Sequence, residues 1–371
     1  MHNKKLRRTG VELQICDRLK HHHIETCQDL LSLTPLEVMR LAGQSYCQSL
    51  QLLKSVSLAC APKIIPALEL WSQRKDLCFS TSLSELDRLL HGGLPRGTIT
   101  EVTGPSGCGK TQMCMMLSVL ATLPRSLGGL DSGVIYIDTE AAFSAERLLE
   151  IAQSRFPVYF SVPERLLETA GRVHLFKELT CQEVLTRLDR LEEDIISCGA
   201  GLVILDSVAS VVRKEFDTSL LGNLTQRANL LGRQAATLKY LAQEFRMPVV
   251  VTNQITTHLS ERAAPSSLGT PAEGDSAYVT AALGNTWSHN VNTRLIVQYV
   301  DAQLRQIIIA KSPVAPFAVL NYTIQAEGIR LAGNSRNDVT SSAQGTDPGR
   351  QPIRVRTGFD YRLTGAMPLE P

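Results

Sequence analysis

The segment from Gly104 to Gln112, GPSGCGKTQ, holds residue types whose spacing can bind a nucleotide phosphate. It matches G-x-x-x-x-G-K-[ST] through Thr111, and it follows a β-type run and begins a helical run, which is the context that this pattern requires. Glycines let backbone N–H groups face phosphate oxygens, Lys110 reaches the terminal phosphates, and a Thr hydroxyl ligates Mg²⁺. We therefore expect a nucleotide site made by Gly104, Pro105, Ser106, Gly107, Cys108, Gly109, Lys110, Thr111 and Gln112.

An acidic residue at the end of a second apolar run extends this site. Asp206 follows the run LVIL, and open α/β sheets bind ligands at the carboxyl ends of their strands. A carboxylate there can support the Mg²⁺ that Thr111 ligates. The alternative is an aspartate that only caps a turn.

Hydrolysis also requires a group that orients and deprotonates water. The run VIYIDTE places two carboxylates, Asp138 and Glu140, just beyond another apolar strand, and either can accept a proton near the terminal phosphate. Spacing alone leaves the choice open. Gln254 ends the run VVVTNQ, where its amide can bind a phosphate oxygen or simply satisfy the local backbone.

These residues are positioned by alternating β-type and helical runs between about 81 and 330. Such alternation predicts a mostly parallel sheet that is covered on both faces. After a loop rich in Ser, Pro, Gly and Ala at 258–283, three β-type runs with short connections predict an antiparallel extension. The core should therefore occupy residues 81–332.

The two ends of the chain differ from this core. Residues 1–60 read as short amphipathic helices, with Gly43 in a turn that either grips a DNA phosphate or only reverses the chain. Residues 61–80 carry two prolines and predict a linker. Residues 333–371 are rich in Gly, Pro, Ser and Thr, so we expect a disordered tail.

Composition excludes several classes of protein. The net charge is only +2, so contact with nucleic acid must come from local basic segments. Nine cysteines without a C-x-x-C pair indicate reduced thiols, and no run is long enough to cross a membrane, so we expect a soluble, non-secreted protein. The basic run KKLRR at 4–8 is a nuclear import signal, a DNA-touching arm or a solvated end, and three consecutive histidines at 21–23 are interpreted as surface residues.

Together, GPSGCGKTQ, YIDTEAAFSAERL, LVILDSVASVVRKEF, VTNQI and ALGNTWSHNVNTRL resemble the RecA/RadA-type strand-exchange ATPases. The helical N-terminus resembles the archaeal and eukaryotic branch, and the segments LHGGLPRG and DSVASVVRKEFD are most similar to its eukaryotic recombinase paralogues. The resemblance covers residues 1 to about 330. It implies a RecA-like P-loop ATPase core preceded by a small all-α domain similar to a helix-hairpin-helix.

The resemblance also implies roles for single residues. It selects Glu140 over Asp138 as the carboxylate that activates water, with Lys110 as the second catalytic residue. ATP and Mg²⁺ are the implied cofactors, with Thr111 and Asp206 at the metal. It places Arg147 near the adenine and makes Gln254 the sensor of the terminal phosphate.

The resemblance further implies a nuclear, DNA-dependent ATPase of homologous recombination and double-strand break repair, with weak turnover. Its partners would be other recombinase paralogues, the main strand-exchange recombinase, and single-stranded or branched DNA, without a membrane. An ATP-binding scaffold that barely hydrolyses ATP is the alternative. Two loops, about 211–227 and 255–283, would contact DNA through Arg213, Lys214, Arg227 and Arg262, with Tyr278, Trp287 and His289 as candidate aromatic platforms.

One linker feature departs from the filament-forming members. They insert a Phe-x-x-Ala segment into the neighbouring subunit, whereas this chain has Ile64 at the Phe position and retains Ala67. An aliphatic side chain fills an aromatic pocket poorly, so long self-assembled filaments are not expected.

Overall fold

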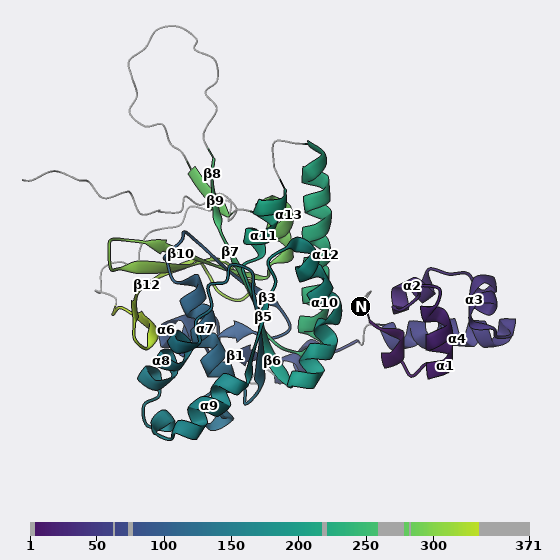
Figure 1. Ribbon diagram of the computed structural model, residues 1–371, viewed down its shortest axis with the longest axis horizontal. Coiled ribbons are helices and arrows are strands. Elements are labelled where there is room, and N and C mark those ends of the chain that lie inside the picture. Colours follow the sequence, from purple (N-terminus) through teal and green to yellow (C-terminus); the bar gives the residue numbers. More distant parts are fainter. Residues whose placement is uncertain are drawn as a thin grey trace, which may run out of the picture.

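A nine-stranded sheet organises the computed structural model of the protein, which describes residues 4–61, 64–72, 77–216, 221–258, 278–281 and 283–333 (Figure 1). Its strands are β3 (Ile99–Thr103), β4 (Gly133–Asp138), β5 (Val173–Lys177), β6 (Ala200–Asp206), β7 (Val249–Asn253), β10 (Thr293–Tyr299), β11 (Arg305–Lys311), β12 (Ala318–Gln325) and β13 (Gly328–Leu331). The spatial order is β13-β12-β11-β10-β3-β7-β6-β4-β5. Strands β10 to β5 pair in parallel and β10 to β13 pair antiparallel, which confirms the predicted fold class.

Helices cover both faces of this sheet. One face packs on α6 (Ser84–Leu89), α7 (Lys110–Thr122), α8 (Ala145–Arg155) and α9 (Pro163–Gly171). The other packs on α10 (Cys181–Cys198), α11 (Val208–Glu215), α12 (Leu221–Phe245) and α13 (Gly284–Asn290). Two short ladders, β1 (Cys78–Phe79) with β2 (Leu94–Pro95) and β8 (Ile255–His258) with β9 (Tyr278–Ala281), and the 3₁₀ turns η3 (Arg125–Leu127) and η4 (Tyr159–Ser161) complete the core. Strands β3, β4 and β7 are buried along their whole length, because parallel sheets are covered on both faces.

The first residues form a separate helical layer with its own apolar centre. It contains η1 (Leu6–Arg8), α1 (Leu13–Lys20), α2 (Cys27–Leu31), α3 (Pro35–Ala42) and α4 (Tyr46–Cys60), which pack around Leu19, Leu30 and Val56. Thr26, Thr34 and Ser45 each begin a helix with a reciprocal capping box. Gly43 ends α3 in the left-handed conformation at φ 65° and so permits the turn into α4. The linker contributes α5 (Ala67–Ser72).

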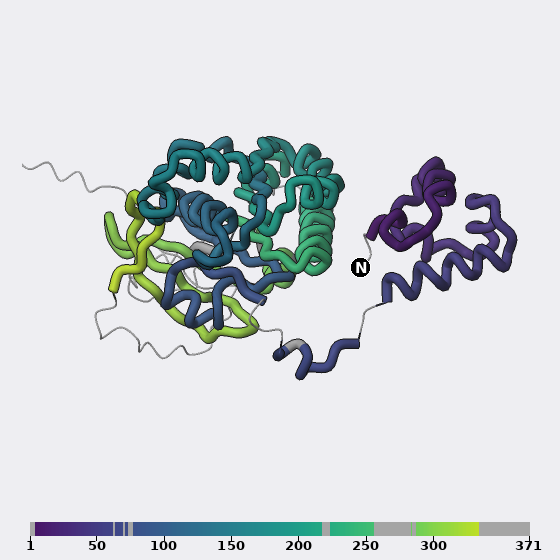
Figure 2. Tube along the Cα trace, turned by 90° about the horizontal axis from the view of Figure 1, so that it is seen from below, coloured from purple at the N-terminus to yellow at the C-terminus, as the bar shows by residue number. Residues whose placement is uncertain are grey.

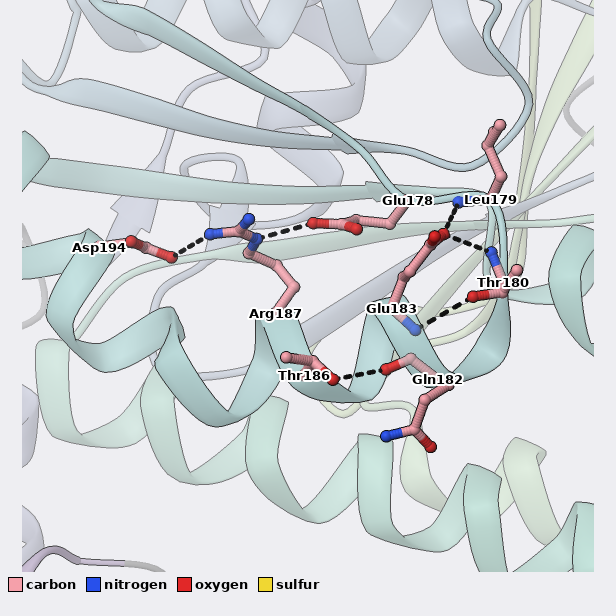
Figure 3. Close-up of polar contacts among 8 residues, drawn as sticks. All are labelled: Glu178, Leu179, Thr180, Gln182, Glu183, Thr186, Arg187 and Asp194. Carbon is pink, nitrogen blue, oxygen red and sulfur yellow. Dashed lines mark hydrogen bonds and ion pairs between the residues drawn. The ribbon is translucent and has the colours of Figure 1, made fainter.

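Local side-chain chemistry also fixes the first turns of helix α10, where Figure 3 shows the polar contacts. Thr180 accepts a hydrogen bond from the Glu183 backbone, and the Glu183 carboxylate accepts from the N–H groups of Leu179 and Thr180. Arg187 then joins Glu178 at 2.8 Å and Asp194 at 3.2 Å. These contacts fix the start of the helix. Its later turns carry Glu192 and Glu193, which pair with Arg8 and Lys5 of the N-terminal segment.

The basic run at 4–8 joins the helical domain to the core. Figure 2 shows the helical domain to one side of the core. Lys5 pairs with Glu193 at 2.8 Å, and Arg8 pairs with Glu192 at 2.8 Å. Arg7 instead pairs with Asp17 of α1 at 2.6 Å. Of the three readings left open for this run, a freely solvated end does not fit Lys5, Arg7 and Arg8, because each of them pairs with a carboxylate.

The structure bears on four further predictions, which concern the histidines, the two loops, membrane spans and the tail. The histidines at 21–23 are exposed, as expected. Much of the expected loop at 211–227 is helical, since it is divided between α11 and α12. No helix among the described residues has the length and apolar character that a membrane crossing demands. Most of the predicted second loop, including Arg262, and the tail from residue 334 lie outside the described residues.

Candidate nucleotide site

The loop between β3 and α7 curls as its glycines permit. Gly107 and Gly109 have φ of 78° and 91°, in the left-handed region that other residues avoid. At position 104 a glycine is required for lack of space, because a Cβ there would lie 2.1 Å from the Val297 carbonyl oxygen. Helix α7 begins at Lys110, so its free N–H groups face the loop, an arrangement that binds phosphate.

Two tyrosines of the antiparallel extension hold the outer side of this loop. The Tyr299 hydroxyl donates to the Ser106 carbonyl at 3.2 Å, and the Tyr322 hydroxyl donates to the Cys108 carbonyl. Cys108 is fully buried, and burial raises the pKa of its thiol to about 11. The Cys108 side chain is therefore turned into the core, and the two tyrosines hold the loop through the Ser106 and Cys108 carbonyls.

Asp206 lies at the centre of a hydroxyl cluster. Its carboxylate accepts from Thr111 at 2.8 Å, from Tyr136 at 2.7 Å, and from Thr252. Burial raises the pKa of Asp206, and these three hydrogen bonds oppose that rise. The Thr111 hydroxyl and the Asp206 carboxylate are oxygen donors of the kind that Mg²⁺ prefers, so the residues present fit this ion.

Glu140 lies on the same side, held by two donors. Ser207 Oγ donates to its Oε1 at 2.6 Å, and Gln254 Nε2 donates to the same oxygen at 2.7 Å. Asp138 has a different task, because its carboxylate accepts the backbone N–H groups of Glu140, Ala142 and Phe143 at 3.0 to 3.3 Å. Asp138 is thus a buried cap for the loop that presents Glu140.

Lys110 points back to its own loop and contacts the carbonyls of Gly104 and Pro105, both at 2.9 Å. Burial lowers the pKa of Lys110, whereas the charges of Asp206 and Glu140 raise it. Lys110, Thr111, Glu140 and Asp206 all line one cavity of about 710 Å³. The cavity therefore contains a cation for phosphate, two oxygen donors for a metal, and a carboxylate base.

Arg147 lies at the other end of this cavity. Its Nε donates to Gln112 at 2.7 Å, and its Nη atoms donate to the carbonyls of Gln325 and Ala326 at 2.5 and 3.1 Å. Ile324, Gln325 and Ala326 also line the cavity. Since its edge donors are engaged, Arg147 offers a flat guanidinium face, which suits stacking on a base.

Gln254 connects this site to two of the predicted DNA-contacting residues. Arg213 donates to Gln254 Oε1 at 3.2 Å and to the Ile255 carbonyl at 3.1 Å. Burial lowers the pKa of Arg227, and the positive charge of Arg213 lowers it further. Lys214 is exposed on the same helix as Arg213. Arg213 is therefore the basic residue that lies directly beside the proposed phosphate sensor.

The prediction that Trp287 is an aromatic platform for DNA was wrong. Trp287 is fully buried and donates its indole N–H to Glu101 at 2.9 Å, so its ring cannot stack on a base. His289 is exposed on the same helix. The sequence also gave no sign of Tyr136, Thr252 and Ser207 at the site, although each lies within two residues of a predicted one. Period-2 alternation along β4 and β7 was the available signal, since it turns Tyr136 and Thr252 to the Asp206 side.

Comparison with known proteins agrees with this geometry. The Rad51 family model matches residues 73–332, and the XRCC3/RpoA-like helix-hairpin-helix domain model matches residues 6–60. The human "DNA repair protein RAD51 homolog 2" is 56% identical over 355 residues, covering 92% of each chain, and the mouse protein of that name is 56% identical over 91% of this chain and all of its own. Mouse "DNA repair protein XRCC3" is 31% identical over 85% of this chain and 95% of its own. The segments LHGGLPRG and AALGNTWSHNVNTRL resemble the B-type vertebrate paralogue. The similarity to these two relatives over most of the chain supports that resemblance.

Proposed function

Because the chain belongs to the Rad51 family, we propose that it is a DNA-stimulated ATPase of homologous recombination and double-strand break repair. Members of this family are DNA-dependent ATPases in general, and the relatives above are named as DNA repair proteins. One observation carries the hydrolytic part of the proposal. Glu140, Asp206 and Lys110 line a single cavity around the loop at 104–111.

The residues divide the work of hydrolysis among them. Backbone N–H groups at the start of α7 and the Lys110 ammonium bind the β- and γ-phosphates. Thr111 and Asp206 would hold Mg²⁺, which neutralises charge on the phosphates when bound. Glu140 orients water and accepts its proton, and Ser207 and Gln254 fix the carboxylate for that task.

Contact with DNA is proposed through the basic residues beside Gln254. Arg213 lies in the last turn of α11 and contacts Gln254 directly, and Arg227 lies in the first half of α12. A change at the terminal phosphate would therefore reach a DNA-contacting group through one side chain. Lys214 and Arg262 are proposed as further phosphate contacts, with single-stranded or branched DNA as the ligand.

We further propose that the protein works in the nucleus, in a hetero-oligomer of recombinase paralogues that assists loading or remodelling of the main recombinase. Support comes from the linker, where Ile64 stands at the Phe position of filament-forming members and is 99% exposed. Residues 1–60, 61–80, 81–332 and 333–371 are proposed as helical domain, linker, ATPase core and tail. A scaffold that binds ATP without turnover is the competing function.

ATP turnover by the full chain tests this proposal, measured alone and with paralogue partners, with and without single-stranded DNA. We expect DNA to raise turnover, Lys110→Ala to abolish it, and Glu140→Gln to lower it by ~10²–10⁴-fold while ATP still binds. Glu146→Gln is the matched control, because this exposed carboxylate accepts from the Ser144 hydroxyl at 2.9 Å and does not line the cavity. ATP binding with background turnover in every variant would favour the scaffold.

A further inference from the structure

A buried carboxylate lies on the sheet face opposite the nucleotide. Glu101 of β3 has no solvent exposure and accepts three side-chain donors, each from a different element. Asn253 Nδ2 of β7 lies 2.6 Å from its Oε1, Trp287 Nε1 of α13 lies 2.9 Å from the same oxygen, and Arg294 Nε of β10 pairs with Oε2. Arg294 also donates to Ser288 at 3.1 Å. One acceptor therefore joins β3, β7, α13 and β10.

The end of β7 is held from both faces. Val250 packs in the apolar cluster on the nucleotide side, whereas Val249 and Val251 pack in the cluster that contains Trp287. The alternation continues to the strand end, where Thr252 contacts Asp206 and Asn253 contacts Glu101. Gln254, the next residue, donates to Glu140. The peptide between Asn253 and Gln254 is thus fixed by Glu101 behind and by Glu140 in front.

The same carboxylate anchors both ends of the segment that leaves this strand. Asn253 stands at the entry of the segment, and Trp287 and Arg294 stand after its exit. The two ends lie side by side, since Ile255 pairs with Ala281 in the β8–β9 ladder. The Asn253 amide and the Trp287 indole both donate to Oε1, so a movement of this oxygen with Asn253 also changes the hydrogen bond of Trp287.

We propose that Glu101 is a positioning residue that couples Gln254 at the nucleotide site to helix α13, and so to the far end of the 255–283 segment. The inference rests on the proposed function, because the Glu101 cluster would be the path by which nucleotide binding reaches a DNA-contacting segment. Asn253 is the transmitting residue. A deprotonated carboxylate has acceptors only, so the Asn253 amide must present its NH₂ to Glu101, and its orientation is fixed.

The chain offers a direct spectroscopic test. It has only two tryptophans, Trp71 in the linker and Trp287 in this cluster, and Trp71 is 67% exposed on α5. Trp71→Phe therefore leaves Trp287 as the sole reporter in the full-length chain. We expect magnesium with a slowly hydrolysed ATP analogue to change the emission of Trp287. Asn253→Ala in this background should remove the change, while calorimetry still detects nucleotide binding.

Thr100→Val is the matched control. Thr100 is buried beside Glu101 on β3, and its hydroxyl has no hydrogen-bond partner, so the emission change should persist. Trp287→Phe supplies a second measurement, since it removes the indole donor and keeps an aromatic ring; DNA stimulation of turnover should fall while turnover without DNA is kept. Nucleotide binding with unchanged Trp287 emission would overturn this inference alone. Failure of the nucleotide to bind would overturn the proposed function as well.

Discussion

Two regions of this molecule hold carboxylates in opposite ways. In the core, Glu101 and Asp206 are buried and each accepts three side-chain donors. At the contact between the helical domain and the core, the side chain of Glu193 is 70% exposed and has Lys5 as its partner. Water can replace a lost partner at the second region and not at the first. A carboxylate with hydrogen-bond donors therefore fixes the geometry of a site in the core, whereas at the domain contact it only holds the helical domain to the core.

The largest expected effect comes from breaking the buried pair. Arg294→Met strands the Glu101 charge away from water and should lower the free energy of unfolding by ~3–5 kcal/mol. Urea unfolding followed by circular dichroism measures it. Arg233→Met is the control, because Arg233 and Asp189 pair at 2.9 Å with both side chains more than half exposed. That variant should lose under ~1 kcal/mol, and equal losses would refute the comparison.

The Asp138 cap should rank second. Asp138→Ala leaves three backbone N–H groups of the loop at 140–143 without their acceptor, which should cost ~1–3 kcal/mol because that acceptor is buried. Turnover should also fall, since this loop presents Glu140. Asp29→Ala removes the half-buried partner of Thr26 in the capping box of α2 and should cost only ~0.5–1 kcal/mol, with turnover kept. A loss of stability without a change in turnover would show that Asp138 does not position Glu140 for hydrolysis.

Arg8 sharpens the comparison, because its contact is intermediate in burial. Its guanidinium pairs with Glu192, whose side chain is 8% exposed, and lies 5.1 Å from the centre of the Phe245 ring. Arg8→Ala should release the helical domain, at a cost of ~1 kcal/mol, and increase the radius of gyration in small-angle X-ray scattering. Arg7→Ala removes an equal charge that pairs within the helical domain, with Asp17, and should leave the radius unchanged.

The sequence revealed the nucleotide site better than it revealed the partners of Glu101 and of the basic run at 4–8, for a physical reason. Phosphate binding needs fixed residue types at fixed spacing, so Gly104 to Thr111 could be located without a structure. Asp206 and Glu140 follow buried strands, and strand ends are legible in an apolar pattern. The partners of Glu101 lie 152 to 193 positions away along the chain, and no local pattern joins them. For the same reason Trp287 was a candidate DNA platform and the role of KKLRR stayed open, since nothing near Trp287, Lys5 or Arg8 reveals its distant carboxylate.

The smallest effect is expected at Lys5, where pH gives the cleanest measurement. The hydrogen bond from Lys5, with its charge, lowers the pKa of Glu193, so this pair contributes stability above the unfolded pKa of a glutamate and loses it as pH falls through the folded value. Because the group is exposed, Lys5→Ala should cost only ~0.2–0.5 kcal/mol at neutral pH. The difference between wild type and variant in urea unfolding should shrink as pH falls below about 4.3, the ordinary pKa of a glutamate, and vanish below the lowered folded pKa of Glu193. A difference that persists there would show that Lys5 holds the helical domain through packing of its alkyl chain, and the contact would then resemble the core more than its exposure suggests.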